Sequence, residues 1–188
     1  MKNIAIFASG SGTNAQKIME HFENRDDVKV RLVLVNNPEA GVIQRADKFN
    51  VPVVKFNRQQ FSKSNDVVDI LVNYQIDLVV LAGFLWLVPQ NMVAAFPNKI
   101  VNIHPALLPN YGGKGMYGDN VHKAVIAAHE KESGITIHYV NEHYDEGAII
   151  AQYTCEINPG DTSDDLASKI HKLEHRYFPQ VIEDVILK

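Results

Sequence analysis

Short hydrophobic runs alternate with amphipathic segments along the first half of the chain. Segments at residues 3–9, 30–35, 51–54 and 78–82 are mainly apolar and have the length of strands, and 78–82 is a continuous apolar run. Between them, residues 15–22, 41–49 and 59–74 carry helical patterns. This alternation predicts βαβ units, and therefore an α/β fold with a doubly wound, mostly parallel sheet and helices on both faces. In the segment 59–74, the positions expected to point inward are Phe61, Val67, Val68, Ile70, Leu71 and Tyr74.

The second half continues the pattern with a strand end near residues 101–104, a helix at 119–129 and strands at 134–140 and 148–153. Thr162 is expected to cap a final helix, with acidic residues in its first turn. Pro179 is expected to kink or interrupt that helix near Phe178. The 188 residues suffice for one sizeable domain, so we expect residues 1–188 to form a single domain.

Composition excludes several classes of function. A formal net charge of -4 argues against a nucleic-acid partner, because phosphate contacts need a clustered basic surface. No apolar run approaches the roughly 20 residues that cross a bilayer, so no membrane partner is expected. The single cysteine allows no internal disulfide and suits a reducing, cytoplasmic location. The oligomeric state stays open between monomer and homodimer.

Asn102 and His104 follow an apolar approach and precede a proline-rich turn. Because strand side chains alternate, both should project from one face of the sheet into one cavity. An amide donates without titrating and an imidazole titrates near neutrality, so the pair suits a reaction in which an oxygen gains negative charge and a proton moves. The structural alternative is a buried strand end whose polar groups bond to turn backbone.

The first predicted strand runs into a glycine loop, S-G-S-G-T-N at residues 9–14, that opens a helix. Free N–H groups at a helix N-terminus bind anions. The spacing of Gly10, Gly12 and Ala15 fits a dinucleotide pattern, but such sites also need an acidic residue after the second strand, where this chain has Asn36. The loop also lacks the Gly-Lys-Ser/Thr ending of a P-loop, so it favours a monophosphate, with an unliganded structural turn as the alternative.

Other loops are expected at the same edge, because ligands of such sheets bind beyond the carboxyl ends of the strands. Residues 83–89, G-F-L-W-L-V-P, suit either the wall of a flat, largely apolar ligand or a buried loop under the next helix. The polar loop 141–147 could supply a carboxylate that raises the pKa of His104 and holds it protonated. The sequence does not choose among Glu142, Asp145 and Glu146.

Two further features lie between these loops. Residues 110–118 include four glycines, so this segment is expected to move and could close over the site. In the following strand, His138 shares a face with Thr136 and therefore points either at solvent or at the site.

The last helix contains H-x-x-E-H at residues 171–175, the inverted zinc-peptidase pattern. No cysteine or histidine cluster elsewhere completes a zinc site, so we predict no metal. Glu174 and His175 are expected on a polar wall or on a solvated helix face instead.

Together these motifs resemble the folate-dependent formyltransferases, and within them the glycinamide ribonucleotide transformylase family of purine biosynthesis. The matching motifs are S-G-S-G-T-N at 9–14, L-A-G-F at 81–84, N-I-H-P-A-L-L-P at 102–109, G-I-T-I-H at 134–138 and D-E-G at 145–147. They cover almost the whole chain in the family's order. The resemblance implies a Rossmann-like formyltransferase fold and transfer of a formyl group from 10-formyltetrahydrofolate to the amine of glycinamide ribonucleotide, without a metal.

The resemblance also implies roles for particular residues. Asn102 and His104 would stabilise the oxyanion formed when the amine attacks the formyl carbon, and Asp145 would keep His104 charged and relay a proton through water. Gly12, Thr13 and Asn14 would hold the phosphate, and Glu174 would lie near the glycinamide end. The donor would be bound by Leu85, Trp86, Leu87 and Val88, which wall the pterin pocket, together with Asn102.

The chain departs from the family pattern at three places. Trp86 stands where the family often has an arginine, and Gln60 lies where relatives often place an arginine for the folate tail, with Arg58 and Lys63 as nearby substitutes. Residues 112–118 also differ, so no role is carried over there. Two other functions fit parts of the pattern. One is formyl transfer to another amine, such as an amino-sugar nucleotide, and the other is a non-catalytic nucleotide-binding module on the same fold.

Overall fold

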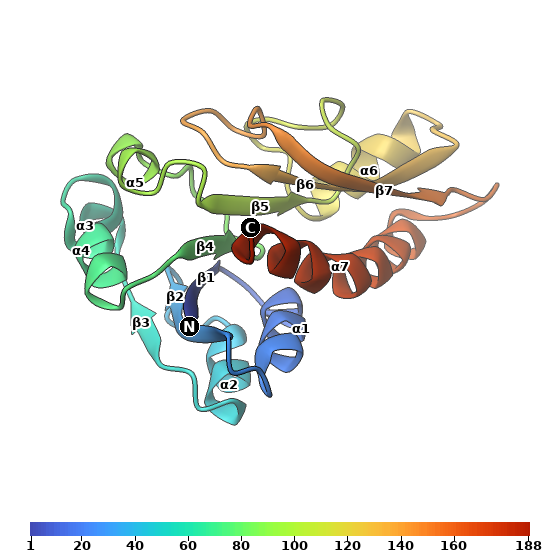
Figure 1. Cartoon of the computed structure of the whole chain (residues 1–188). Helices are drawn as coiled ribbons and strands as arrows, with labels where there is room; N and C mark the ends of the chain where they lie inside the picture. The colour runs from blue at the N-terminus through green and yellow to red at the C-terminus, as the bar shows by residue number, and fades with distance from the viewer.

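The computed structural model describes residues 1–188, and a single seven-stranded sheet of order β3-β2-β1-β4-β5-β6-β7 runs through it (Figure 1). Strands β3, β2, β1, β4 and β5 are parallel, β6 pairs antiparallel with β5, and β7 pairs antiparallel with β6. The predicted doubly wound, mostly parallel α/β sheet is therefore confirmed. The strands are β1 (Lys2–Ala8), β2 (Val28–Val35), β3 (Val53–Lys55), β4 (Leu78–Leu81), β5 (Ile100–His104), β6 (Glu132–Tyr139) and β7 (Ile149–Glu156).

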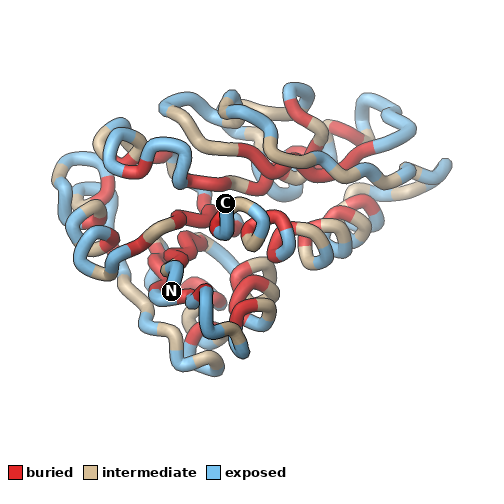
Figure 2. Tube along the Cα trace, in the orientation of Figure 1, coloured by how far each residue is buried: buried red, intermediate tan, exposed pale blue.

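Helices cover both faces of the sheet. They are α1 (Thr13–Phe22), α2 (Val42–Lys48), α3 (Arg58–Ser62), α4 (Asp66–Asn73), α5 (Gln90–Ala95), α6 (Asp119–Ala127) and α7 (Ser163–Ile186). Strand β1 shows how the two layers arise: Ile4 and Ile6 belong to the cluster packed under α1, α2, α6 and α7, whereas Ala5 and Phe7 belong to the cluster under α3, α4 and α5. Burial of both faces explains the continuous apolar runs (Figure 2).

The segment 59–74 forms two helices rather than the single predicted helix. Helix α3 begins with a capping box between Asn57 and Gln60 and ends at Ser62. The Ser64 hydroxyl then donates to the Gln60 carbonyl (3.1 Å) and accepts from the Asp66 N–H (3.3 Å). Serine side chains compete in this way for backbone groups, which breaks the helix between two apolar turns. Phe61, Val67 and Leu71 are buried as predicted, while Val68, Ile70 and Tyr74 are only partly buried.

Helix α7 runs without a break through Pro179, so the predicted interruption is wrong. A proline inside a helix costs about 3 kcal/mol through its missing hydrogen bond and ring clash. Here Pro179 is buried with Phe178 and Ile182, so packing against the sheet offsets that cost. The predicted cap is confirmed, because Thr162 and Asp165 form a capping box.

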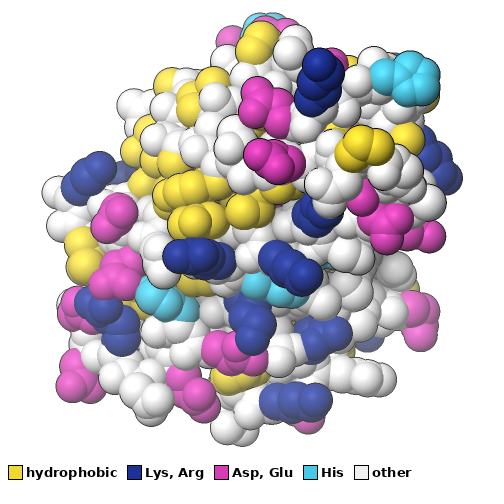
Figure 3. Space-filling view, turned by 90° about the vertical axis from the view of Figure 1, so that its right-hand side faces the viewer, with side chains coloured by type: hydrophobic (Ala, Val, Ile, Leu, Met, Phe, Trp, Pro, Cys, Tyr) yellow, Lys and Arg dark blue, Asp and Glu magenta, His cyan; other side chains and the backbone are white.

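None of the helices combines the length and the hydrophobicity that crossing a membrane would require. On the face seen from the right of Figure 1, basic and acidic side chains are interspersed around a group of hydrophobic side chains (Figure 3).

Replacing Gly134 by alanine is expected to destabilise the pairing of β6 with β7. A Cβ atom at this position would lie 2.1 Å from the Tyr153 carbonyl oxygen and 2.7 Å from Leu107 Cδ2. Overpacking of this kind lowers the free energy of unfolding by about 1 to 3 kcal/mol, measurable by urea denaturation. Gly10→Ala is the matched control, because an added Cβ there meets nothing within 4 Å. Equal stability of the two variants would contradict the packing argument.

Candidate active site

One cavity of about 650 Å³ opens beyond the carboxyl ends of β1, β4 and β5. Its lining includes the glycine loop at 9–14, the segment 81–88 and the end of β5 at 102–105. The segment 113–118 and the loop residues 143–145 complete one side, with His122 from α6 and Glu174 from α7 nearby. The predicted gathering of loops at one edge of the sheet is therefore observed.

The glycine loop presents the N-terminus of α1 to this cavity. Gly12 is the N-cap residue, with a left-handed φ of 76°, and no side chain caps the helix. Only glycine fits there, because a Cβ atom would lie 2.4 Å from Val42 Cβ. The first N–H groups of α1 therefore remain available to a ligand. Asn14 Nδ2 donates to Glu174 Oε2 (2.9 Å), which joins the loop to α7.

Asn102 has a partner that fixes its orientation. His138 Nδ1 lies 2.8 Å from the Tyr139 carbonyl oxygen, which can only accept, so this nitrogen carries the hydrogen. His138 Nε2 is then the acceptor for Asn102 Nδ2, at 3.1 Å. The question left open by the sequence is thereby answered, since His138 is buried and lines the cavity rather than facing bulk solvent.

His104 is 3% exposed and contacts two different polar groups. Its Nε2 donates to the Tyr111 carbonyl oxygen (2.7 Å), and its Nδ1 lies 3.6 Å from Asp145 Oδ2. Burial lowers the pKa of His104 below its usual 6.5, although Asp145 and the Tyr111 carbonyl act in the opposite direction. Asp145 therefore raises the pKa of His104, as the sequence suggested, but the loss of solvation outweighs the nearby charge and the net shift is downward.

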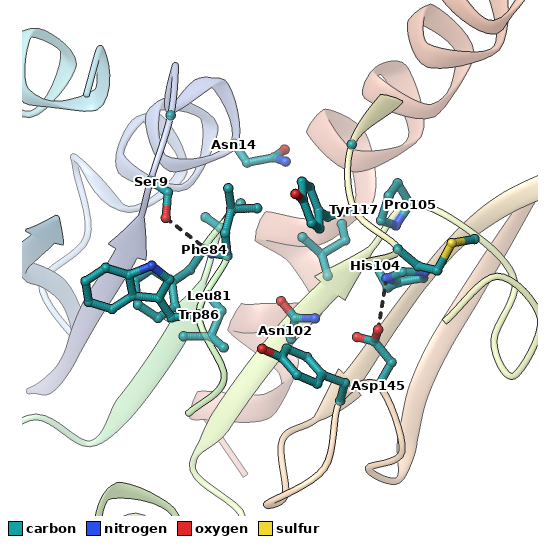
Figure 4. Close-up of a pocket in the computed structure, with 18 of the residues that line it drawn as sticks. Ser9, Asn14, Leu81, Phe84, Trp86, Asn102, His104, Pro105, Tyr117 and Asp145 are labelled. Atoms are coloured by element: carbon teal, nitrogen blue, oxygen red, sulfur yellow. Dashed lines mark hydrogen bonds and ion pairs between the residues drawn. The ribbon is translucent and has the colours of Figure 1, made fainter. Parts of the chain in front are cut away.

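Asp145 is the carboxylate of the late polar loop that reaches the site, whereas Glu142 and Glu146 are exposed. Asp145 Oδ2 accepts from the Gly113 N–H (2.9 Å), and Oδ1 lies 3.7 Å from His138 Nε2. Burial alone would raise the pKa of Asp145, but His138, His104 and the Gly113 N–H together hold it below its usual value. Asp145 is therefore ionised near neutral pH, and it meets His104 beside Asn102 (Figure 4).

Leu85, Trp86, Leu87 and Val88 all line the cavity. Val88 is buried, while Leu85 and Leu87 are 48% and 39% exposed. The Trp86 ring packs against Phe56, Phe61 and Phe84. The Arg58 guanidinium lies 4.5 Å from the centre of the Trp86 ring, a cation–π contact. This apolar wall and the His104–Asp145 pair lie on opposite sides of Asn102 (Figure 4).

Glu174 is 5% exposed and lies in the cavity wall, whereas His175 is not a lining residue. His171 Nδ1 lies 2.9 Å from Glu174 Oε2, and this hydrogen bond raises the pKa of His171. Two of the three residues that the H-x-x-E-H pattern specifies, His171 and Glu174, thus form a hydrogen-bonded pair at the cavity.

The sequence reasoning missed His122, which is 3% exposed and lines the cavity. Its Nδ1 is buried without a hydrogen-bond partner, and burial lowers its pKa. His122 lies between the core positions Val121 and Val125 of α6. A histidine on the inner face of that amphipathic helix was the signal that could have identified it.

The comparisons with known proteins agree with this geometry. A family model described as formyl transferase matches residues 2–182. The chloroplastic phosphoribosylglycinamide formyltransferase of Arabidopsis thaliana is 41% identical over 187 residues, which cover 96% of this chain but only 64% of that protein. The Bacillus subtilis phosphoribosylglycinamide formyltransferase is 35% identical, with coverage of 99% and 95%. The crystal structure of the Bacillus halodurans phosphoribosylglycinamide formyltransferase superposes with a TM-score of 0.89 at 38% identity, with coverage of 100% and 96%.

The lowered pKa of His104 predicts how stability depends on pH. Below about pH 6.5 the unfolded chain binds protons that the buried ring resists, so the free energy of unfolding should fall as the pH drops. One such group changes the free energy of unfolding by at most about 1.4 kcal/mol for each pH unit. Urea denaturation at pH 7.5 and 5.5 measures the change, which should shrink in His104→Asn. The exposed His129→Asn is the control, and an unchanged pH dependence in His104→Asn would refute the assignment.

Proposed function

The chain belongs to the formyl transferase family, and we propose that it transfers the formyl group of 10-formyltetrahydrofolate to the amine of glycinamide ribonucleotide. The observation that carries the proposal is the convergence of Asn102, His104 and Asp145 in the cavity that also contains the glycine loop. The name shared by the relatives, phosphoribosylglycinamide formyltransferase, supports this choice of acceptor.

The cavity offers separate places for the two substrates. The acceptor phosphate would bind the free amides of Gly12, Thr13 and Asn14 at the N-terminus of α1. Glu174, joined to Asn14, would lie near the glycinamide end. The pterin of the donor would lie against the wall formed by Leu85, Trp86, Leu87 and Val88. The amine and the formyl carbon would then meet beside Asn102, which lies between the two places.

The reaction exchanges one carbon–nitrogen bond for another. The acceptor amine attacks the formyl carbon, and the formyl oxygen becomes an oxyanion that accepts a hydrogen bond from Asn102 Nδ2. Collapse of this intermediate breaks the bond between the formyl carbon and N10 of the folate. The amine loses one proton and N10 gains one, so the products are the formylated ribonucleotide and tetrahydrofolate. No metal enters these steps.

His104 and Asp145 would handle the proton. Because Nε2 of His104 is committed to the Tyr111 carbonyl, Nδ1 is the nitrogen that gains or loses a proton. Burial disfavours the charged form of the ring, and the negative charge that develops on the oxyanion would raise its affinity for a proton. The separations of 3.6 and 3.7 Å from Asp145 to His104 and His138 are longer than direct hydrogen bonds, which suits a relay through water.

The proposal extends to organisation and location. We propose that residues 1–188 act as one formyltransferase domain, as a monomer or homodimer, in the cytoplasm. The chain spans 64% of the Arabidopsis relative, whose name places that protein in the chloroplast, so fractionation of the source cells is the direct check of location.

Asn102→Ala is expected to lower kcat by about a hundredfold or more, because it removes one donor to the oxyanion. The assay mixes the protein with glycinamide ribonucleotide and 10-formyltetrahydrofolate and follows release of tetrahydrofolate. The exposed Asn73→Ala serves as a control for the loss of an amide elsewhere. Near-normal turnover in Asn102→Ala would remove this residue from the mechanism, and an inactive parent protein would end the proposal.

Trp86 is the only tryptophan in the chain and lines the cavity. Binding of 10-formyltetrahydrofolate against this ring should therefore give a saturable change in intrinsic fluorescence. Glycinamide ribonucleotide alone, bound at the glycine loop, should change it far less. Trp86→Phe has no tryptophan, so it serves as the control for light that the folate itself absorbs. A protein that catalyses formyl transfer without any fluorescence change on folate binding would place the pterin elsewhere.

A further inference from the structure

Helix α2 contacts the glycine loop at two consecutive carbonyl groups. The Val42 N–H donates to the Gly10 carbonyl (3.2 Å), and Arg45 Nε donates to the Ser11 carbonyl (2.7 Å). Neither Val42 nor Arg45 lines the cavity. The two contacts therefore act on the loop from outside the space where a ligand would bind.

Arg45 also reaches the helix that follows the loop. Its Nη1 donates to Gln16 Oε1, and the Gln16 N–H donates to the Gly12 carbonyl (2.9 Å). A single guanidinium thus joins the backbone before Gly12 to the first turn of α1 after it. The planar, forked guanidinium suits this task, because it can donate to two acceptors in fixed directions.

These bonds determine which backbone groups remain for a ligand. The carbonyls of Gly10, Ser11 and Gly12 are all occupied as acceptors. The N–H groups of Thr13 and Asn14 have no acceptor within the helix, and both residues line the cavity. The permanent positive charge of Arg45 next to the loop further favours an anion there.

We propose that Arg45 is a positioning residue for the phosphate of the acceptor. It fixes the Ser11 carbonyl relative to Gln16 of α1 so that the amides of α1 converge on the phosphate, and it does so without touching the phosphate. The inference rests on the proposed function, because it takes the anion at this loop to be the phosphate of glycinamide ribonucleotide.

Kinetics of Arg45→Ala test this role. Loss of a charge-assisted hydrogen bond that aligns the loop should raise KM for glycinamide ribonucleotide about tenfold or more. Because the group acts on binding, kcat should change by less than about twofold. Arg45→Lys keeps the charge without the fork and should fall between Arg45→Ala and the parent protein. Lys48→Ala is the matched control, since it removes one positive charge from an exposed position on the same helix.

A phosphate-free acceptor separates positioning from general damage to the fold. With glycinamide ribonucleoside, which lacks the phosphate, Arg45→Ala and the parent protein should have equal kcat/KM. An Arg45→Ala protein that is impaired equally with both acceptors would overturn the proposal. The proposal would also be overturned if Arg45→Ala and Lys48→Ala had the same KM for glycinamide ribonucleotide.

Inorganic phosphate gives a readout that does not depend on the reaction. Millimolar phosphate should raise the thermal unfolding midpoint of the parent protein and of Lys48→Ala, and should raise that of Arg45→Ala much less. Equal shifts in all three proteins, or no shift in the parent protein, would overturn the role of Arg45. A parent protein that shows the expected pattern of shifts but no formyl transfer would refute the proposed function while leaving the role of Arg45 in anion binding intact.

Discussion

Burial of the parallel strands on both faces is the constraint on which the cavity depends. Strands β1, β4 and β5 lie between two helical layers, and their side chains alternate between two separate hydrophobic clusters. A slip of one residue would exchange the faces of a strand, so burial fixes the register. The carboxyl ends of these strands then lie at one edge, where Ser9, Ala82 and Asn102 line the same cavity. The placement of Asn102 and His104 therefore comes from a strand whose other residues, Ile100, Val101 and Ile103, are apolar and buried.

The same burial controls the charges in the site. His104 and Asp145 face one another, yet burial lowers the pKa of the histidine, while contacts with His138, His104 and Gly113 keep the pKa of the carboxyl group low. Because burial disfavours the charged form of the ring, a negative charge that developed nearby would favour its protonation. For the histidine, the lost hydration of the ring outweighs the attraction of the nearby charge.

Periodicity alone predicted the sheet and the shared face of Asn102 and His104, since both follow from alternation along strands. It could not choose Asp145 over Glu142 and Glu146, because that choice depends on the loop backbone. Asp145 has a positive φ of 56°, and Gly147 lies so close to the Tyr139 carbonyl that a Cβ would be 1.7 Å away. The direction of the net pKa shift of His104 could not be predicted for a related reason. The net shift depends on how deeply the ring is buried and on which charges lie near it in the folded protein. Neither can be read from the spacing of residues in the sequence.

The segment that follows β5 gains a definite role from its backbone. The sequence indicated only that residues 110–118 were glycine-rich and could cover the site, but two of its peptide groups bond to the proposed catalytic pair. The Tyr111 carbonyl accepts from His104, and the Gly113 N–H donates to Asp145. Both residues have positive φ values, 56° and 97°, which turn neighbouring peptide groups in directions that an extended chain does not allow. One short segment therefore supplies an acceptor to the imidazole and a donor to the carboxylate. Movement of this segment would change the protonation of both groups together.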